Sequence, residues 1–399
     1  MAYSPYNLQD VYDASAQEKF KVISTFAGGG GSSTGYRLAG GKVLVINEYV
    51  PVAAETYAEN YPDTVILPGD IKELTGQDFL DAAGVGVGEI DILDGSPPCS
   101  AFSVSGSLSH NIHEEEHIDL WGNVTVEKVS GKHSDGWGKT KNYSDGKKVE
   151  NIEDLFFEFL RIAKEIKPKV IVAENVKGLT VGEAKEYFNK ILNEFENIGY
   201  EVSAQVLDSR YYGVSQTRTR VIFIGVREDV AEKVGYNFMN ISQVFPEPDK
   251  DVIPVKDVME GLVNGEKEVK YLTEKFTKTA YWKQTGSKMP VDPDKVLTGM
   301  DYHPKGHHFN LKRVSQYQPS PTITAMGSAE TTAGAFHWNE ARKLTLGELK
   351  RITTLPDDFK LTGKWNQKSE RIGRMVPPLM LKAIAESVYE NVLKVYNNG

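Results

Sequence analysis

The sequence predicts an α/β protein with a doubly wound parallel sheet as its main domain and a second, smaller, irregular domain. Three observations support this fold class. Short β-branched runs alternate with helical periodicity in the first half of the chain, and turn-forming residues follow several of the runs. A long aperiodic stretch then interrupts the pattern before helices return near the C-terminus. At 399 residues the chain is long enough for two domains.

Six apolar runs are predicted to form the strands of the sheet. The clearest helix lies at 152–166, where apolar residues recur with a 3.6-residue period until Lys167-Pro168 ends it. Further helical patterns occupy 345–353 and 377–396. The predicted strands are 22–26, 43–47, 65–67, 90–93, 170–173 and 221–226.

Two regions interrupt this alternation. Residues 103–150 are polar and rich in Gly, Ser, Lys and His, and they are too long for an ordinary strand-to-helix connection. We expect them to form an extended active-site loop. Residues 228–337 combine scattered prolines, aromatics and basic residues without strong periodicity, which predicts the second domain. The main domain would then comprise 1–227 and 338–399.

The composition is that of an ordinary globular protein, with 40% hydrophobic and 25% charged residues. No apolar run is long enough for a membrane span, and the first residues do not resemble a secretory leader, so we expect no membrane association and a cytoplasmic location. If the source is a bacterium or a phage, we expect association with the nucleoid.

Charge is distributed unevenly along the chain. The net charge is -9, which argues against a protein that coats nucleic acid over its whole surface. Residues 266–318, however, contain ten Lys or Arg against six Asp or Glu, a local net charge of +4 that leaves -13 for the rest. A local basic surface in the second domain is therefore expected.

Cys99 is the single cysteine of the chain and directly follows two prolines after a predicted strand. One cysteine excludes a disulfide-stapled fold and any zinc cluster built from several cysteines. Because the strand at 90–93 ends at the carboxyl edge of the sheet, and Pro97 and Pro98 restrict the turn, the thiol should lie where ligands bind. A lone cysteine is usually a small buried hydrophobe, but this placement favours a nucleophile.

A glycine-rich loop follows the first predicted strand, at residues 26–31. Such a loop lets the backbone approach a ligand closely, and Glu48 follows about 20 residues later, where a nucleotide fold places its ribose-binding carboxylate. Ser33 and Thr34 break the strict pattern of a dinucleotide-binding loop, so a dehydrogenase is disfavoured and an adenosine-type cofactor remains open. A tight turn beside a solvated acid is the alternative.

Two further segments carry residues suited to proton control. Glu174 ends another predicted strand, where a carboxylate could assist a nucleophilic addition; by itself it would be a surface acid. Arg218 and Arg220 precede the last β-branched run and share one side of it, although an edge-strand contact to phosphate or solvent is the simpler interpretation.

Taken in order along nearly the whole chain, these segments resemble the cytosine-5 DNA methyltransferase family. The resemblance implies a Rossmann-like methyltransferase sheet and places a target-recognition domain in the variable stretch that contains the basic residues. The matching segments are Phe26-Ala27-Gly28, Glu48, Gly69-Asp70-Ile71, Pro97-Pro98-Cys99, Glu174-Asn175-Val176, Gln216-x-Arg218-x-Arg220, 342–345 with 355–359, and Gly373 with 376–378.

The resemblance also implies a mechanism and a set of site residues. Cys99 would add to C6 of a cytosine flipped out of double-stranded DNA, so that C5 can attack the alkyl group of an S-adenosylmethionine-type cofactor. Glu174 would hold the base edge, with Arg218 and Arg220 in support. Ser103 and Thr322 would contact DNA, no metal would be needed, and the protein would act as a monomer. The cofactor would contact Phe26, Ala27, Gly28, Gly30, Glu48, Tyr49, Asp70, Ile71, Pro98 and Arg374.

The sequence departs from the family pattern at two places. Arg374 replaces the usual Asn of the last motif, which would bring a cation close to the sulfonium of S-adenosylmethionine. One hypothesis is that Arg374 binds the carboxylate of carboxy-S-adenosylmethionine, giving carboxymethylcytosine; the alternative is that it pairs with DNA phosphate or a local acid. Ser24-Thr25 also stands where many relatives have an acidic residue.

Other functions remain open on the sequence. The segment from His113 to His117 has the spacing of a zinc protease motif if it is helical, although it lacks apolar flanks. A tRNA cytosine-5 methyltransferase would share the catalytic segments. A catalytically silent DNA-binding protein is the third alternative, and the intact Cys99 and Glu174 argue against it.

Overall fold

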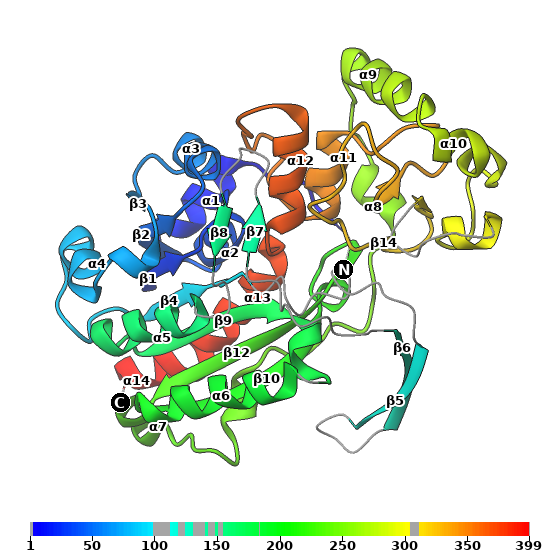
Figure 1. The fold of residues 1–399 in the computed structure, drawn as a ribbon. Coiled ribbons are helices and arrows are strands. Elements are labelled where there is room, and N and C mark those ends of the chain that lie inside the picture. The colour runs from blue at the N-terminus through cyan, green and yellow to red at the C-terminus, as the bar shows by residue number, and fades with distance from the viewer. Residues whose placement is uncertain are drawn as a thin grey trace.

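The computed structural model describes residues 3–98, 155–182, 184–303 and 311–398, together with the backbone of four strands between 112 and 150. A seven-stranded sheet forms the centre of the molecule (Figure 1). Its strands are β1 (Phe20–Thr25), β2 (Gly41–Glu48), β3 (Val65–Pro68), β4 (Ile92–Gly95), β9 (Val170–Val176), β10 (Tyr200–Asp208) and β12 (Thr219–Arg227).

The strand order β10-β12-β9-β4-β1-β2-β3 reverses direction between β1 and β4. The strands β1 to β4 and β9 run parallel, whereas β12 is antiparallel to both β9 and β10. In open α/β sheets, ligands bind at the carboxyl edge beside such a reversal, because the loops that follow the two strands diverge to opposite faces. The topology thus points to the β1 and β4 ends.

All six predicted strands are present within a few residues of the expected bounds. The sequence did not predict β10, because Glu201, Ser203 and Gln205 interrupt its apolar residues. This polar alternation suits a strand at the edge of the sheet, where one side remains accessible to water. The antiparallel direction of β12 was also not predicted. The direction of β12 depends on how the chain reaches it through β10, and β10 itself was not predicted.

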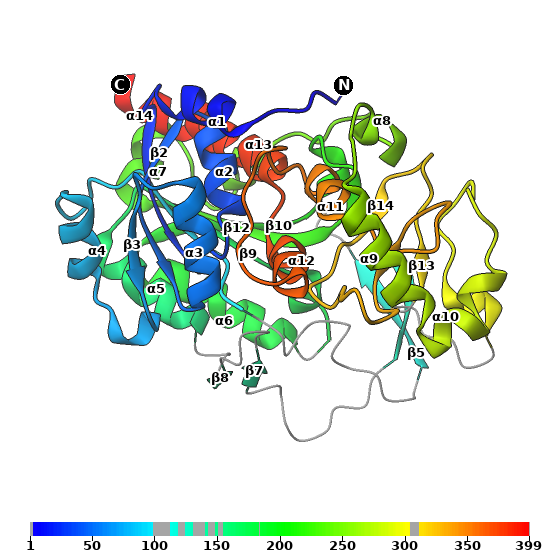
Figure 2. The same ribbon diagram turned by 90° about the horizontal axis from the view of Figure 1, so that it is seen from above.

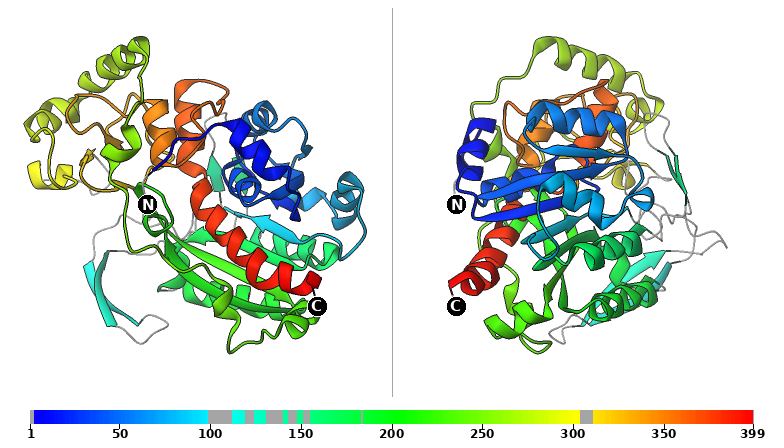
Figure 3. Two further views of the ribbon diagram at one scale, coloured as in Figure 1. Left: turned by 180° about the vertical axis from the view of Figure 1, so that it is seen from behind. Right: turned by 90° about the vertical axis from the view of Figure 1, so that its left-hand side faces the viewer.

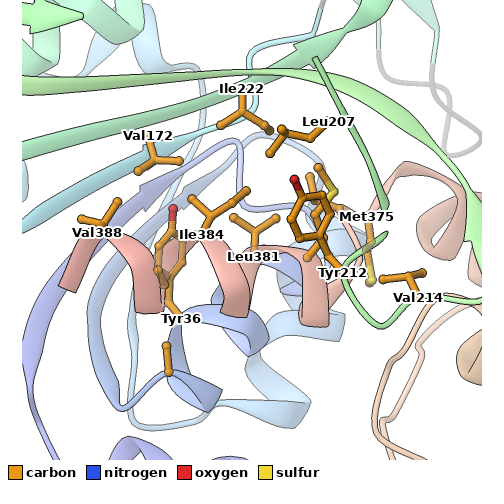
Figure 4. Close-up of a cluster of buried hydrophobic side chains, with 14 of the residues drawn as sticks. Tyr36, Val172, Leu207, Tyr212, Val214, Ile222, Met375, Leu381, Ile384 and Val388 are labelled. Carbon is orange, nitrogen blue, oxygen red and sulfur yellow. The ribbon is translucent and has the colours of Figure 1, made fainter. Parts of the chain in front are cut away.

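Helices cover both faces of the sheet, as the doubly wound prediction requires. On one face lie α1 (Leu8–Ser15), α2 (Gly31–Leu38), α3 (Pro51–Asn60) and α13 (Pro378–Val388), and the left view of Figure 3 shows α13 crossing the sheet. Figure 4 shows their core, in which Ile384 and Leu381 of α13 face Val172 and Ile222 of the sheet. The other face is covered by α4 (Gly76–Ala83), α5 (Leu155–Ile166) and α6 (Ala184–Asn197).

The predicted helices are confirmed, with different ends. The helix at 152–166 is α5, for which residues 151–154 lie outside the described part. The pattern at 345–353 is α11 (Leu346–Ile352), which Thr345 caps through the backbone of Glu348. The pattern at 377–396 is divided into α13, a π-helical turn at Tyr389–Leu393 and α14 (Lys394–Asn398).

The region at 228–337 is irregular, as its sequence suggests. Figure 2 shows α8 (Val255–Met259), α9 (Glu266–Thr277) and α10 (Ala280–Gln284) at one end of the molecule, and its strands have two residues each. A separate small cluster that includes Phe276, Trp282 and Phe336 forms its core. Apolar residues between 230 and 258, including those of α7 (Glu228–Val234), pack instead with the large core of the sheet.

Four strands are present in the stretch predicted as an extended loop. They pair as two hairpins, β5 (Ile112–Ile118) with β6 (Val124–Ser130) and β7 (Thr140–Asn142) with β8 (Lys148–Glu150). His113 and His117 belong to β5, so their Cα atoms are roughly 13 Å apart along a strand and the helix that the zinc motif needs is not formed. The zinc protease interpretation is therefore wrong in its structural premise.

The described residues lack two features, a metal-binding cluster and a membrane-spanning helix. Within that part of the chain, no cluster of three or more His, Cys, Asp or Glu side chains is arranged to hold a metal ion. In the same residues, no helix combines the length and the hydrophobicity needed to cross a bilayer.

Candidate active site

The predicted cofactor residues converge at the carboxyl edge of the sheet. Residues 26–30 follow β1, Glu48 and Tyr49 end β2, Asp70 and Ile71 follow β3, and Pro98 follows β4. They converge because parallel strands all present the same end at one edge. Arg374 is the last residue of α12 (Trp365–Arg374), and Met375, which follows it, packs against Gly29 of the loop after β1.

Glu48 holds the glycine loop in place. Its Oε2 accepts a hydrogen bond from the backbone N–H of Gly28 at 2.7 Å, and its Oε1 accepts one from Val50 at 2.7 Å. The loop is left-handed at Phe26 (φ 53°), Gly28 (φ 57°) and Gly30 (φ 100°), which explains two of its glycines. The carboxylate predicted to bind a cofactor thus also fixes the loop beside it.

The glycines of this edge serve two different purposes. At Gly28 and Gly69, both left-handed, a Cβ would meet no atom within 4 Å, so the backbone borders open space. At Gly31 a Cβ would lie 2.7 Å from the carbonyl oxygen of Val376, and at Gly29 it would lie 2.4 Å from Met375. The open positions border a space beside the backbone that we call the cradle, whereas the closed ones pack against the segment after α12.

Asn47 and Asp70 shape the neighbouring turns. The Nδ2 of Asn47 donates to the carbonyls of Leu67 and Gly69, each at 3.0 Å, which joins the ends of β2 and β3. Asp70 accepts a hydrogen bond from the N–H of Lys72 at 3.0 Å and so caps the short helix η1 (Ile71–Glu73). Both side chains stabilise the walls of the cradle.

Glu174 and Arg220 form the clearest charged pair of the site. The Nε of Arg220 lies 2.6 Å from Oε1 of Glu174, and the side chains are 15% and 13% exposed. They meet because β9 and β12 are antiparallel neighbours, so that Glu174 lies across from Ile222. The N–H groups of Arg220 do not align with this oxygen, so charge rather than an ideal hydrogen bond holds the pair.

Asn175 connects this pair to the segment that precedes the cysteine. Its Nδ2 donates to the carbonyl of Pro97 at 3.3 Å, and the side chain is buried. Glu174 therefore lies at the same edge as Pro97 and Pro98. Cys99 and Ser103, the predicted nucleophile and DNA contact, lie outside the described residues.

Arg218 has a different environment from Arg220. Its guanidinium is buried and donates to the carbonyls of Ile323 (3.3 Å), Gly373 (3.0 Å) and Arg374 (3.4 Å). Burial, and secondarily the nearby charge of Arg220, lowers the pKa of Arg218 to about 9. The sequence grouped the two arginines as catalytic, but the hydrogen bonds of the Arg218 guanidinium in the structure are with backbone carbonyls.

Thr322 lies beside Arg218 in a three-segment junction, which we define as residues 216–218, 320–325 and 373–374. Its Oγ1 donates to the carbonyl of Thr217 at 2.6 Å, and the N–H of Ile323 donates to Oε1 of Gln216 at 3.1 Å. A Cβ at Gly373 would lie 2.4 Å from the carbonyl carbon of Thr324. The hydroxyl predicted to contact DNA is thus bonded within the protein.

Arg374 is paired with an acid of its own helix. Its Nε and Nη2 donate to Oε1 of Glu370 at 2.9 and 2.6 Å, with Glu370 one turn earlier in α12. This is the local-acid alternative considered from the sequence. The pair reduces the repulsion that an isolated guanidinium would exert on a cationic ligand.

Sequence reasoning missed Asn47, Asn175 and Asp94 as parts of this edge. Each is buried and hydrogen-bonded at the end of a strand. A polar residue that ends an otherwise apolar run was the available signal. Its partner could not be predicted, because it belongs to a strand distant in the sequence.

Comparison with known proteins matches most of the chain to one family. The family model described as C-5 cytosine-specific DNA methylase matches residues 20–125 and 137–390. The Type II methyltransferase M.Eco47II of Escherichia coli is 29% identical over 94% of this chain and 80% of the relative. The Type II methyltransferase M1.HphI of Haemophilus parahaemolyticus is 26% identical over 92% of this chain and 86% of the relative.

Solved structures share the fold at low sequence identity. A putative DNA modification methyltransferase encoded within a prophage of E. coli superposes with a TM-score of 0.65 at 19% identity, covering 94% of this chain and 99% of that one. The Dnmt2 methyltransferase of S. pombe gives a TM-score of 0.55 at 14% identity, covering 93% and 98%. These matches support the Rossmann-like methyltransferase fold.

Proposed function

The chain belongs to the C-5 cytosine-specific DNA methylase family, and from this premise we propose that it transfers a methyl group from S-adenosylmethionine to C5 of a flipped cytosine in double-stranded DNA. The observation that carries the proposal is the Glu174–Arg220 pair, which Asn175 holds next to the Pro-Pro segment that leads to Cys99. A base-binding acid and a nucleophile would thereby share one edge.

The chain's own residues account for the chemistry of the base. The Cys99 thiolate adds to C6 of cytosine while the protonated Glu174 carboxyl group donates its proton to N3, which leaves a neutral enamine and makes C5 nucleophilic. Arg220 holds the Glu174 carboxyl group in position. C5 then attacks the methyl group, and the S–CH3 bond breaks so that the sulfur leaves as a thioether. A base removes the proton from C5, N3 returns its proton to Glu174, and elimination of the Cys99 thiolate restores the C5–C6 double bond.

The described residues fit S-adenosylmethionine, which supplies the electrophilic methyl group when bound. Gly28 and Gly69 leave open space beside the backbone at the ends of β1 and β3. Glu48 and Asp70 end or follow adjacent strands at this cradle, where carboxylates can accept hydrogen bonds from ribose hydroxyls and an adenine amino group. Phe26, Tyr49, Ile71 and Pro98 would supply apolar walls.

Methyl is the group that we propose to be transferred. The hypothesis of carboxy-S-adenosylmethionine depended on an uncompensated cation at Arg374, and the Glu370 carboxylate compensates it. We therefore expect 5-methylcytosine as the product with S-adenosylmethionine, and little carboxymethylcytosine with the carboxylated cofactor. An Arg374→Asn variant should keep methyl transfer.

Mass spectrometry of nucleosides from DNA incubated with each cofactor tests the proposal. We expect 5-methylcytosine from the wild type and about a hundredfold to a thousandfold slower formation by Glu174→Gln, by analogy with loss of a group that stabilises the transition state. The matched control is Glu186→Gln, an exposed acid of α6 paired with Lys190, which should keep full activity. An equally active Glu174→Gln enzyme would contradict the proposed role.

Trapping experiments separate the alternative functions. Duplex DNA containing 5-fluorocytosine should form a covalent adduct, since the fluorine at C5 cannot leave as a proton does. An adduct with tRNA but none with DNA would select the tRNA methyltransferase. No adduct with either, although DNA binds, would select the catalytically silent DNA-binding protein.

We also propose that the enzyme modifies DNA in a restriction–modification system, because its relatives are Type II methyltransferases. Residues 228–337 would provide the target-recognition domain. Thr322 of this domain would lie where it meets the main domain, since its hydroxyl donates to the carbonyl of Thr217. Resistance of the modified DNA to a matching endonuclease would be the direct measurement.

A further inference from the structure

The side chain of Asp94 is buried at the point where the sheet reverses its strand order, and the proposed reaction gives it no role. It is 2% exposed and lies in β4, directly opposite Ser24 of β1 in the strand register. Ser24 is one of the two positions at which the sequence departs from the family pattern. A buried carboxyl group reduces the stability of the folded protein unless it is hydrogen-bonded.

Two hydroxyl groups from different elements bind the Asp94 carboxylate. Ser24 Oγ donates to Oδ2 at 2.6 Å, and the hydroxyl of Tyr36 in α2 donates to Oδ1 at 3.1 Å. In Figure 4 the Tyr36 side chain is directed from α2 toward the sheet. Burial raises the pKa of Asp94 to about 7, the hydroxyl contacts oppose this rise, and the charge of Glu174 adds to it.

Asp94 is close to both loops that would enclose the cofactor. Ser24 lies two residues before Phe26, so strand geometry places the Asp94 Cα roughly 8 Å from the start of the glycine loop. Along the chain, Asp94 precedes Pro98 by four residues, and β4 ends between them at Gly95. A charge buried at this position is weakly screened by water and acts on any ion held between the two loops.

We infer that Asp94 is a selectivity residue of the cofactor site, whose carboxylate favours the cationic methyl donor over the demethylated product. The inference rests on the proposed function. Transfer of the methyl group to C5 leaves the sulfonium as an uncharged thioether, so the attraction to a buried carboxylate exists for the substrate and is lost for the product. The carboxylate therefore assists product release as well as substrate binding.

Among the described residues that contact the Asp94 carboxyl group, no other side chain changes charge near neutral pH. Burial also lowers the pKa of Lys343 to about 7, but its ammonium group donates to the carbonyl of Ala333 in another part of the chain. Burial raises the pKa of Tyr36 well above its ordinary value, so the phenol stays neutral. Glu174 of β9 is paired with Arg220, and the neighbours in the strand register, Ser24 and Val172, do not titrate. The selectivity should accordingly depend on pH.

Calorimetric binding of S-adenosylmethionine and S-adenosylhomocysteine to the full chain, at about pH 6 and about pH 8, tests the inference. For the wild type, the Kd of S-adenosylhomocysteine divided by the Kd of S-adenosylmethionine should rise roughly fivefold between these two pH values, as Asp94 ionises. Asp94→Asn should keep the ratio nearly constant. Both ligands carry the same amino group, so its titration affects the two constants similarly.

Two control variants make the result specific. Asp91→Asn changes another buried acid, which precedes β4 and pairs with Lys169, and should retain the wild-type change of the ratio. Tyr36→Phe keeps the Asp94 carboxyl group but removes one hydrogen-bond donor that favours its ionised form. The pKa of Asp94 should rise, and the increase in the Kd ratio should therefore occur at higher pH. If Asp94→Asn does not fold, this displacement still tests the inference.

Three outcomes are decisive. A ratio that is constant with pH in the wild type, or that still rises in Asp94→Asn, would overturn the inference while leaving methyl transfer intact. Failure of the wild type to bind either ligand would instead refute the proposed function. An increase of the Kd ratio with pH that is present in the wild type and in Asp91→Asn but absent in Asp94→Asn would support both the inference and the proposed function.

Stability provides a readout that needs no ligand. Because the pKa of Asp94 is raised from 3.8 to about 7, the folded chain holds a proton between these values that the unfolded chain has lost. The wild type should therefore lose stability relative to Asp94→Asn as the pH rises from about 4 to about 7. A constant difference between the two unfolding curves would show that Asp94 does not titrate as inferred.

Discussion

The carboxyl edge of the sheet, which we call the cofactor edge because the predicted cofactor residues lie there, is next to the three-segment junction. The two regions are built in different ways. At the cofactor edge, side chains follow the ends of neighbouring parallel strands, and Gly28 and Gly69 border open space. At the junction, backbone from three distant parts of the chain is in direct contact, and Gly373 has no room for a side chain. The backbone of one region borders open space, whereas the backbone of the other is closely packed at Gly373.

This difference shows that residues of the same type have different structural roles in the two regions. Arg220 at the edge pairs with Glu174, whereas Arg218 at the junction donates to three backbone carbonyls. Changes at the junction should reduce stability before they reduce binding. Changes at the edge should do the reverse, and the following predictions test this contrast in order of expected effect.

Arg218→Ala should have the largest effect on stability. Three backbone carbonyls would lose their charged donor in a buried position, which predicts a loss of about 3 kcal/mol in the free energy of unfolding. Urea denaturation followed by fluorescence measures it. Arg220→Ala, at the partly exposed edge, should lose much less stability although it should lose activity; equal losses of stability would remove the contrast.

Gly373→Ala compared with Gly28→Ala should give the next largest effect. The new Cβ at 373 would overlap the backbone of Thr324, so we expect a loss of about 2 kcal/mol in unfolding free energy. At Gly28 the space is open and only the left-handed backbone is strained, so cofactor affinity should fall more than stability. Thermal unfolding and calorimetric binding, applied to both variants, should rank them in opposite orders.

Glu370→Gln should weaken cofactor binding without unfolding the protein. The variant leaves the Arg374 guanidinium without its negative partner on α12, and we expect a roughly fivefold higher Kd for S-adenosylmethionine. Glu386→Gln breaks an exposed pair of the same spacing with Lys382 on α13 and should leave that Kd unchanged. If both variants bind like the wild type, the Glu370 charge does not offset Arg374.

Thr322→Val should have the smallest effect. The change removes one hydrogen bond to the Thr217 carbonyl and nearly keeps the shape of the side chain, which predicts a loss of about 1 kcal/mol in unfolding free energy. DNA affinity should change little, because the hydroxyl is bonded within the protein. A large loss of DNA binding with unchanged stability, measured by fluorescence anisotropy, would instead support a direct contact of Thr322 with DNA.

Local patterns made much of the fold and of the cofactor edge predictable. The apolar runs at the six strands and the stripe of α5 carry their period in the sequence. Glu48 could be placed at this edge because it follows a predicted strand of a parallel sheet, and Asp70 was placed there by the resemblance to the family. Strand β10 could not be predicted from the same pattern, because its polar alternation is meaningful only once it is known to lie at the edge.

The sequence by itself determined the fold class, the order of the family segments and the residues that gather at the carboxyl ends of the strands. Only the tertiary structure decided which of these residues contact each other. It directed Arg218 to backbone carbonyls more than 100 residues away, paired Arg374 with Glu370, and placed Asp94 opposite Ser24. The physical reason is that periodicity and turn residues act over a few positions, whereas burial and pairing depend on segments brought together by the folded sheet.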